Sequence, residues 1–244
     1  MARRILEISG PERVKFLQGL VTNDVNRLAE AGILYAAMLT PQGKYLADFF
    51  LIEREGAIAL DVDAALGDGL AQRLKMYRLR SKVEIGESDL QLARGTGMPP
   101  AGALTDPRSA ALGWRAYGSE SGEDGSDWDA LRVGEIVPES GIELTPDSYI
   151  LEMGFERLNG VDFRKGCYVG QEVTARMKHK TELRKGLATV EIDGAAPPGT
   201  PITAEGKPAG TLFTQSGGRA IAHLRFDRAV GEMRAGDAVL RRAG

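Results

Sequence analysis

The chain has 244 residues, of which 43% are hydrophobic and 27% charged, and these are the proportions of an ordinary folded protein. Its single cysteine excludes an intramolecular disulfide and a cysteine-rich metal site built by this chain alone, and its two histidines argue against a histidine-rich metal centre. No stretch approaches the roughly 20 apolar residues of a membrane helix, and the N-terminal residues lack the apolar core of a signal peptide. We therefore expect a cytoplasmic protein with no metal centre and no membrane span.

The formal net charge of -3 excludes a uniformly basic nucleic-acid binder, but charge is distributed unevenly along the chain. Residues 157–185 carry eight basic and three acidic side chains, a surplus of +5, and residues 73–82 carry five basic side chains and no acid. Between Glu120 and Asp147, nine acidic side chains accompany a single arginine. Such asymmetry is typical of a protein that binds an anionic ligand. It also fits one solvated face beside another, so both interpretations stay open.

The first part of the chain alternates helix-type and strand-type hydrophobic patterns. Ser9-Gly10-Pro11-Glu12 has the form of a capping box with an early proline and predicts a helix start, and Asp63 predicts the cap of a second helix. In chain order we expect a strand over 5–8, a helix ending at Gly32, a hairpin of strands 35–39 and 45–52, a strand over 57–62, a helix through Tyr77 and a closing strand at 83–85. This order predicts an α+β fold, with an antiparallel sheet and its helices packed on one face.

The rest of the chain has shorter and less regular patterns. Residues 93–143 are rich in glycine, proline and acids, so we expect loops around a short strand at 112–117 in a trimmed subdomain. Thr145-Pro146-Asp147 predicts a helix start, with Gly154 as its end. Short β runs then follow, at 187–192, 201–204, 210–215, 220–226 and 238–240. They predict a small barrel or sandwich, and hence two domains, residues 1–185 and 186–244.

The chain's single cysteine lies in a segment that suits chemistry. Gly166 and Gly170 bracket Cys167, which lets the backbone turn sharply and approach a ligand. The pattern predicts a helix beginning near Gln171, and the N-terminus of such a helix, together with the neighbouring Lys165, favours a reactive thiolate. Most free cysteines are small buried side chains, and that alternative stays open.

The sequence Lys165-Gly166-Cys167-Tyr168-Val169-Gly170-Gln171-Glu172 closely resembles the signature of the YgfZ-type folate-binding proteins. These are relatives of the glycine-cleavage T-protein (aminomethyltransferase) that support iron–sulfur enzymes. Further segments resemble the family's motifs in the family's order, namely Phe16–Val25, Pro41–Lys44 with Asp48–Leu51, and Tyr77–Val83. The T-protein branch lacks the Lys-Gly-Cys-Tyr cassette, so its presence here argues against glycine cleavage as the main role.

The resemblance implies ferredoxin-like α+β units and a small C-terminal β-barrel, arranged as in the T-protein fold around a central hole that holds tetrahydrofolate. It implies catalytic roles for the residues within the signature, Lys165, Cys167 and Tyr168. Folate has an anionic glutamate tail, which basic side chains can pair with, and a pterin ring, which needs a carboxylate or an amide. The candidate cofactor-binding residues are Arg78, Arg80 or Lys165 for the tail, and Asn23, Asp24 or Glu172 for the pterin. Asn23 and Asp24 also fit a purely structural use as hydrogen-bonding residues at a helix.

On this resemblance we expect a tetrahydrofolate-binding accessory protein for the assembly or repair of iron–sulfur clusters in client enzymes, including tRNA-modifying ones. Cys167 would be the working thiol, either as a cluster ligand shared with a partner or as a nucleophile toward a folate-borne one-carbon unit. One alternative is an enzyme, a folate-dependent one-carbon transferase of the aminomethyl type. Another is an RNA-binding module, suggested by the basic segment at 157–185. The net charge of -3 and the lack of an RNA-binding motif count against it, so we do not expect direct nucleic-acid binding.

Overall fold

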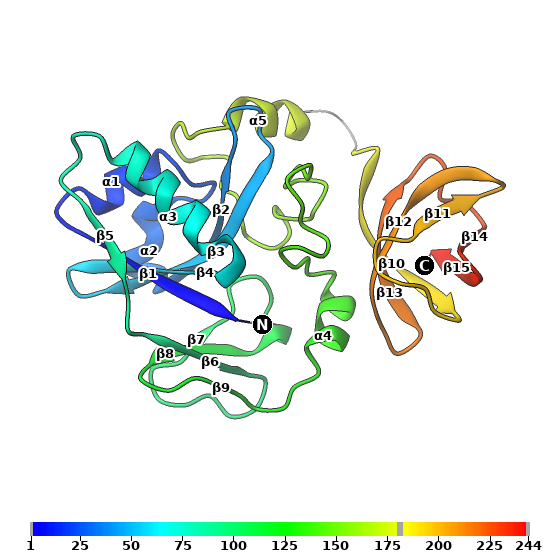
Figure 1. Ribbon diagram of the computed structural model, residues 1–244, viewed down its shortest axis with the longest axis horizontal. Coiled ribbons are helices and arrows are strands. Elements are labelled where there is room, and N and C mark those ends of the chain that lie inside the picture. The colour runs from blue at the N-terminus through cyan, green and yellow to red at the C-terminus, as the bar shows by residue number, and fades with distance from the viewer. Residues whose placement is uncertain (1, 180–182, 243–244) are drawn as a thin grey trace. The chain divides into compact units, whose positions relative to one another are not determined.

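The computed structural model describes residues 2–179 and 183–242, and the chain divides into two compact units (Figure 1). The first unit comprises Met1–Ser126 and Phe155–Ala175, and the second comprises Asp127–Gly154 and Arg176–Gly244. The segment that contains the cassette therefore belongs, up to Ala175, to the same unit as the N-terminal half of the chain. In the described part of the chain, no helix combines the length and the apolar character that spanning a bilayer requires.

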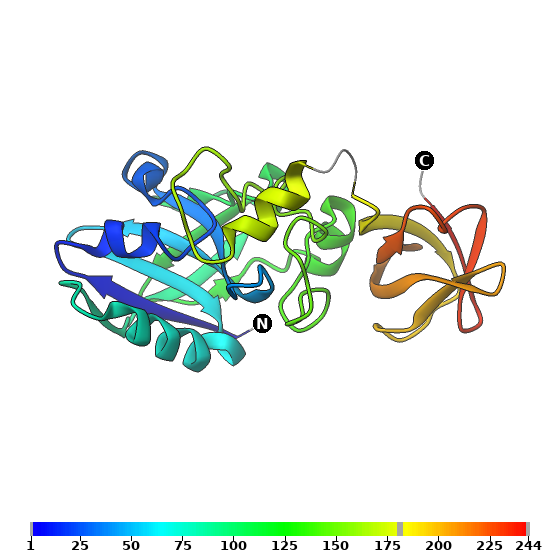
Figure 2. The ribbon, with the colours of Figure 1, turned by 90° about the horizontal axis from the view of Figure 1, so that it is seen from above.

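A five-stranded antiparallel sheet forms the centre of the first unit (Figures 1 and 2). Its elements are β1 (Arg3–Ser9), α1 (Arg13–Gln18), the 3₁₀ helix η1 (Val25–Arg27), α2 (Leu28–Ala31), β2 (Ile33–Leu39), β3 (Tyr45–Arg54), β4 (Ala57–Asp63), α3 (Ala64–Arg78) and β5 (Glu84–Glu87). The strand order is β2-β3-β4-β1-β5. The predicted α+β class, the hairpin and the helix capped by Asp63, whose side chain accepts from the backbone N–H of Ala65 at 2.8 Å, are confirmed.

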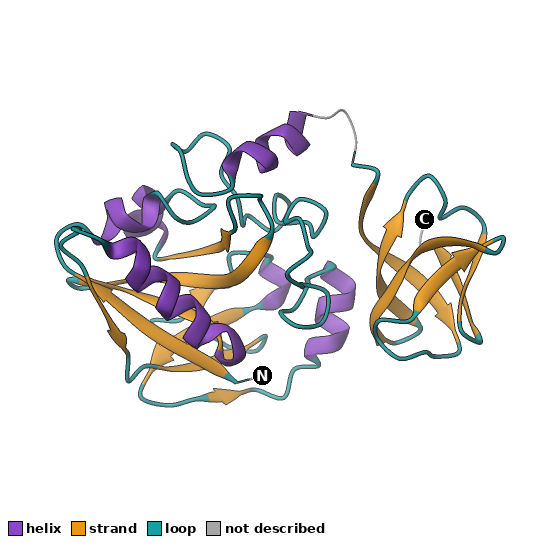
Figure 3. Ribbon diagram, turned by 45° about the horizontal axis from the view of Figure 1, so that its top comes forward, coloured by secondary structure: helices purple, strands orange, loops and turns teal. Residues whose placement is uncertain are grey.

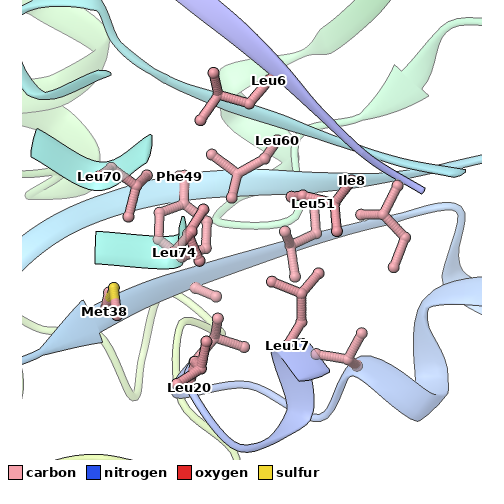
Figure 4. Packing of buried hydrophobic residues seen from close by; sticks show 14 of the residues in the cluster. Leu6, Ile8, Leu17, Leu20, Met38, Phe49, Leu51, Leu60, Leu70 and Leu74 are labelled. Atoms are coloured by element: carbon pink, nitrogen blue, oxygen red, sulfur yellow. The ribbon is translucent and has the colours of Figure 1, made fainter. Parts of the chain in front are cut away.

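One face of this sheet packs against the helices to form the main apolar core (Figure 4). Side chains alternate across a strand, so Phe49 and Leu51 of β3 face the helices, while Asp48 and Phe50 face the other way. Leu74 of α3 packs into the same apolar cluster. The second face of the sheet is also buried, but it carries carboxylate, arginine and tyrosine side chains.

The prediction of a single helix between Ser9 and Gly32 is wrong, because the structure has three short helices there, α1, η1 and α2. Ser9 ends β1, and the carboxylate of Glu12 accepts from the backbone N–H of Lys82 at 2.6 Å, so no capping box forms. Between the helices, the side chain of Asn23 accepts from the N–H of Asp24 at 2.9 Å. Side chains of this type compete for backbone groups and interrupt helices, which the apolar spacing alone does not reveal.

Residues 93–143 are more regular than expected. A second small sheet, in the order β7-β8-β6-β9, is built from β6 (Gln91–Gly95), β7 (Leu104–Thr105), β8 (Trp114–Gly118) and β9 (Gly122–Glu123), with the 3₁₀ helix η2 (Ala110–Leu112) before β8. The strand predicted at 112–117 corresponds to β8. The glycine-rich pattern hid these strands because they are only two to five residues long.

The second unit contains a closed barrel of six strands, as Figure 3 shows in orange. The strands are β10 (Lys185–Asp193), β11 (Pro201–Ala204), β12 (Lys207–Ser216), β13 (Arg219–Arg225), β14 (Glu232–Ala235) and β15 (Ala238–Arg242). The predicted C-terminal β-barrel is confirmed, with β14 as a strand that the sequence pattern did not reveal. Helix α4 (Trp128–Glu135), capped by Asp127, belongs to the same unit. The domain division between residues 185 and 186 stays a prediction. The two compact units divide the chain differently, because Asp127–Gly154 groups with the barrel.

The helix predicted from Thr145 to Gly154 is wrong, because this stretch forms successive turns. The hydroxyl of Ser148 accepts from the backbone N–H of Thr145 at 3.0 Å, which closes a turn instead of starting a helix. The carbonyl oxygen of Glu152 accepts from the N–H of Leu187 at 2.9 Å, so the segment pairs with the barrel. By contrast, the helix predicted near Gln171 is confirmed as α5 (Gln171–His179).

Candidate functional site

The cassette loop, residues 164–170, is fixed against the turn of the β2–β3 hairpin. Gly170 has a φ of +86°, and a Cβ placed on it would lie 2.6 Å from the carbonyl oxygen of Thr40. In the turn, Gly43 has a φ of +74°, and its Cβ would lie 2.8 Å from the Cβ of Val173. Only glycine combines a left-handed backbone with so close an approach. The structure thus brings the Pro-Gln-Gly-Lys motif and the cassette together.

Lys165 connects the cassette loop to the segment that follows α1. Its ammonium donates hydrogen bonds to the carbonyl oxygens of Gln18 (2.9 Å), Asn23 (2.8 Å) and Val21. An ammonium carries three protons, so these three carbonyls use its whole donor capacity. The side chain is buried. This geometry fits a positioning residue that ties two distant segments together, and it leaves no proton of Lys165 free to pair with a folate tail.

Burial lowers the pKa of Lys165 to about 8, although the carboxylates of Asp24 and Asp162 act in the opposite direction. The ammonium lies 4.9 Å from the ring centroid of Tyr168, within the range of a cation–π contact. Tyr168 is itself buried, and burial raises its pKa to about 12. Two of the three signature residues therefore form the buried underside of the loop.

Cys167 is exposed, so the alternative of a small buried cysteine is wrong. On either side of it the chain is held in place: Lys165 is anchored as described, and the backbone N–H of Val169 donates to the carbonyl oxygen of Gly19 at 3.3 Å. Glu172, in the first turn of α5, is also exposed. The loop therefore presents one thiol to the surroundings from a fixed backbone, with a carboxylate five residues further along the chain.

The backbone carbonyl of Asn23 binds Lys165, and the side-chain amide of Asn23 forms hydrogen bonds with the backbone. Its amide nitrogen donates to the carbonyl oxygens of Tyr35 (2.8 Å) and Asn159 (2.7 Å), and its amide oxygen accepts from the N–H of Asp24. The side chain is 5% exposed. We conclude that Asn23 orders the local backbone, while its predicted role toward a pterin stays a prediction.

Asp24 caps η1 at the same place. Its carboxylate accepts from the backbone and side-chain amides of Asn26 and from the side-chain amide of Gln18 at 2.9 Å. Partial burial raises the pKa of Asp24, but these hydrogen bonds, first of all that from the N–H of Asn26, outweigh it and hold the pKa below its usual range. Asp24 is therefore an anion at neutral pH. A carboxylate anion suits both the cap of η1 and a hydrogen-bond acceptor for the donors of a pterin ring.

Arg78 and Arg80 lie elsewhere in the unit. Both are exposed, Arg78 at the end of α3 and Arg80 just after it. Arg80 lines a surface recess with Glu12, Leu79 and Ser81, which are not cassette residues. Their predicted pairing with a folate tail stays a prediction, and the structure gives them a different setting.

The structure also reveals a polar cluster that the sequence reasoning missed, on the second face of the five-stranded sheet. Asp48, 6% exposed, accepts hydrogen bonds from the hydroxyls of Tyr35 (2.9 Å) and Tyr45 (2.6 Å). Burial and the charge of Asp48 raise the pKa of Tyr35 well above its ordinary value. Tyr35 therefore stays a neutral donor to the Asp48 carboxylate.

Asp61 of β4 is the centre of the same cluster. It is fully buried and accepts from Arg3 (2.7 Å), Arg115 (2.6 Å) and the hydroxyl of Tyr117 (2.8 Å). Burial raises the pKa of Asp61, but the charges of Arg3 and then Arg115 outweigh it and hold the pKa below its usual range. Arg115 and Tyr117 belong to β8, so Asp61 joins the two sheets of the unit.

Guanidinium groups cover the aromatic rings of this second face. Arg115 lies 3.8 Å and Arg108 4.8 Å from the ring centroid of Phe50. Arg108 is in turn paired with Asp106 at 2.8 Å. Because each of these arginines has a carboxylate partner, we assign the cluster a structural role. A carboxylate in the middle of a strand-type run, as in Asp48 and Asp61, is the sequence signal that could have found it.

A surface pocket of about 510 Å³ lies beside Asn23. Its wall includes the ring of Phe163 and the guanidinium side chains of Arg27 and Arg164. Asp162, also in the wall, accepts from the backbone N–H of Arg164 at 2.7 Å. The volume and the mixture of aromatic and charged side chains suit a small ligand that has both a flat ring and carboxylates. Of the basic segment at 157–185, Lys180 and Glu182 lie outside the described residues.

Comparison with known proteins gives a consistent result. Residues 184–243 match the family model described as "CAF17, C-terminal beta-barrel domain". The mouse and human proteins named "Iron-sulfur cluster assembly factor IBA57, mitochondrial" are each 30% identical to the chain, over 95% of this chain and 78% of the relative. A homologue of that factor from Mycosarcoma maydis is 32% identical over 80% of this chain. The chain spans just over half the length of this relative and of its Neurospora crassa counterpart, 57% and 54%.

Among solved structures, the glycine cleavage system aminomethyltransferase T of Bartonella henselae is similar in fold, with a TM-score of 0.78 at 15% identity. The match covers 99% of this chain and 83% of that one. The predicted T-protein fold is thereby confirmed. The resemblance to YgfZ-type proteins is confirmed at the level of the wider family, while the named relatives are IBA57 proteins. The prediction of a cytoplasmic location is wrong, because these relatives are named as mitochondrial.

Proposed function

The chain belongs to the IBA57 family of iron–sulfur cluster assembly factors, and we propose that it assists the assembly or repair of iron–sulfur clusters in client enzymes. The observation that carries the proposal is the exposed thiol of Cys167 on a loop anchored by Lys165 and Gly170. A rigid support of this kind suits a ligand that must meet a partner in one defined geometry.

Cys167 is the working residue in this proposal. A single thiolate cannot hold a cluster by itself, since iron–sulfur clusters take about four protein ligands. Cys167 therefore acts as one ligand to a cluster in transit, and the client supplies the others. The cluster is cargo, bound for the client. Lys165 and Tyr168 support the loop from beneath and set the direction of the thiol.

Tetrahydrofolate is the cofactor that we propose alongside the thiol. When bound, it supplies one-carbon chemistry. The pocket beside Asn23 has a suitable volume, about 510 Å³. Arg27 and Arg164 in its wall can pair with the carboxylates of the tail, and Phe163 can contact the pterin ring. Within this proposal, Asp24, next to Asn23 of the pocket wall, and Glu172, in the first turn of α5, remain the candidate carboxylates for the pterin.

The first experiment measures the activity of an iron–sulfur enzyme in cells that lack this protein and are complemented with variants of it. Cys167→Ala is expected to lose support of the client, because no exposed thiol remains. Ser121→Ala, a change at another exposed small residue of the same unit, is the matched control and is expected to behave as wild type. Full client activity with Cys167→Ala would remove the thiol from the mechanism.

The second experiment is an anaerobic calorimetric titration of the purified protein with tetrahydrofolate. We expect saturable binding by wild type and by Cys167→Ala, because the thiol is not part of the pocket wall. Arg164→Ala is expected to weaken binding by roughly tenfold through loss of a charge-assisted hydrogen bond. If the wild-type protein does not bind tetrahydrofolate, the folate proposal fails and the cluster proposal is unaffected. Turnover of a one-carbon donor by the purified protein would favour the transferase alternative.

A further inference from the structure

The last turn of α3 and the residues after it carry an exposed surface that neither the fold nor the proposed site uses. We call it the basic–apolar patch and define it as Arg73, Lys75, Met76, Tyr77, Arg78, Leu79, Arg80 and Lys82. Residues 69–83 contain five lysines and arginines and no acid. Basic residues at the C-terminal end of a helix also complement its dipole, so charge alone does not mark a binding surface.

The dipole of α3 does not explain why the patch also contains exposed apolar residues. Leu79 is 85%, Met76 61% and Tyr77 37% exposed. Toward the sheet, the same helix buries Leu70 and Leu74, so its core contact is complete without them. Single exposed apolar residues are common, but three within four positions form a group, and such groups mark interaction surfaces.

The backbone at Leu79 has an unusual conformation. Its φ is +43° with a ψ of -108°, where a residue with a branched side chain is rarely found. This turn ends α3 and leaves the side chain of Leu79 exposed. A recess of about 680 Å³ lies against it, lined by Glu12, Leu79, Arg80 and Ser81. The surface thus has an exposed apolar side chain, Leu79, beside a recess whose wall includes Arg80 and also Glu12.

The patch stands next to α1, which also reaches the cassette loop (Figure 1). At the start of α1, Glu12 is hydrogen-bonded to the backbone of Lys82. After its end, the carbonyl oxygen of Gly19 accepts from the N–H of Val169. The six residues of α1 span roughly 9 Å at 1.5 Å per residue. Because α1 is this short, a protein bound at the patch can extend along α1 toward the cassette loop that carries Cys167.

We propose that the basic–apolar patch is the docking surface for a protein partner that presents an acidic segment with a large apolar side chain. Charge complementarity sets the acidic character, and Leu79, Met76 and Tyr77 set the need for an apolar group. The proposal rests on the proposed function in one respect: the docked partner is the client, or the carrier that exchanges a cluster with Cys167. Electrostatic attraction brings the acidic partner to the patch, and the apolar contact stabilises the complex.

Two other occupants fit less well. A nucleic acid would match the charge but leave Leu79 and Met76 without an apolar counterpart, and the net charge of the chain is -3. A second copy of the chain would have to offer acids from residues 120–147, and two of these are already used within the chain: Glu123 is paired with Arg94, and Glu143 is buried against Arg132. Both remain as outcomes of the test.

The test uses the full chain and a fluorescent glutamate-rich peptide that carries leucines, with a second peptide in which serines replace the leucines. We expect the first peptide to bind more tightly at physiological salt. Leu79→Ser and the double variant Arg78→Glu with Arg80→Glu are each expected to weaken it by roughly tenfold or more. Met98→Ser, at an apolar side chain that is 93% exposed elsewhere in the unit, and Arg54→Glu are the matched controls and should bind as wild type.

Equal binding by wild type and Leu79→Ser, or equal binding of the two peptides, overturns the proposal. So does displacement of the peptide by tRNA with a dependence on Arg78 and Arg80 alone, which would assign the surface to nucleic acid. Self-association in sedimentation that Leu79→Ser abolishes would assign it to a second copy. In cells, Leu79→Ser should lower client activity while tetrahydrofolate binding is unchanged. If Cys167→Ala keeps full activity but peptide binding still requires Leu79, the docking surface stands and the cluster proposal fails.

Discussion

The two faces of the five-stranded sheet are both buried, but they are stabilised by different physics. On one face Phe49, Leu51 and Leu60 pack against the helices as a purely apolar cluster (Figure 4). On the other face Asp61 and its arginine partners make the contact with the second sheet. Phe49 and Phe50 are adjacent in one strand, yet Phe49 packs in the apolar cluster and Phe50 lies under arginine side chains.

This difference has a consequence for how each face tolerates change. Apolar packing is non-directional, so its loss is governed by the volume and area removed. A buried ion pair depends on both partners, because removing one leaves the other charged and desolvated. Stability of the charged face should therefore depend on pH and on the presence of both partners of each ion pair, and stability of the apolar face on the volume of its side chains. Three variants test this difference between the faces.

The largest effect is expected for Phe49→Ala, on the apolar face. Phe49 is fully buried, and truncation of such a side chain costs about 3–5 kcal/mol in the free energy of unfolding. Urea unfolding at neutral pH measures it. The loss should be the same at acidic pH, since no titratable group is involved. A loss of less than about 1 kcal/mol would mean that the helices contribute little to this face.

The next effect is expected for Asp61→Asn, on the charged face. The carboxylate is 0% exposed and lies between Arg3 and Arg115, so its loss leaves two guanidinium groups with less compensation and costs about 3 kcal/mol. The pKa of Asp61 is lower in the folded than in the unfolded state. Its stabilisation is therefore fully present above the unfolded pKa, about 3.9, and is lost as the pH falls through the folded pKa.

The same variant therefore distinguishes the faces by pH. The difference in unfolding free energy between wild type and Asp61→Asn should be constant between neutral pH and about 5, and should shrink below about 4. Phe49→Ala serves as the pH-independent reference. A difference for Asp61→Asn that persists unchanged into acid would show that its cost is steric and not electrostatic.

The smallest effect is expected for Glu87→Gln, at the surface. Glu87 pairs with Arg4 at 2.5 Å, but its side chain is 63% exposed, and such pairs contribute less than about 1 kcal/mol. Added salt should reduce even this difference. Measured beside Asp61→Asn, it tests whether burial, and not the presence of an arginine–carboxylate pair as such, sets the cost. Equal losses for the two variants would contradict that.

At the candidate site, sequence reasoning found the right segments but not the use of their side chains. The cassette, the N-terminal motif with Asn23 and the hairpin turn do meet, as the contacts of Lys165 and Gly170 show. Lys165, however, gives all three protons to backbone carbonyls. A residue type in a motif does not show which of its atoms remain available, because that depends on the backbone that packs around it.

Local sequence patterns were enough to predict the α+β class, the antiparallel hairpin and the helix capped by Asp63, because alternation within a strand, helical spacing, turn residues and caps are local properties. For the C-terminal β runs they left a barrel or a sandwich open, and the family resemblance implied the barrel. Tertiary contacts were needed to show that Asp48 and Asp61 are buried and hydrogen-bonded, that Cys167 is exposed, and that Arg80 lines a recess with Glu12, Leu79 and Ser81. The physical reason is that burial and pairing join residues as far apart as Asp61 and Arg115, which no local pattern relates.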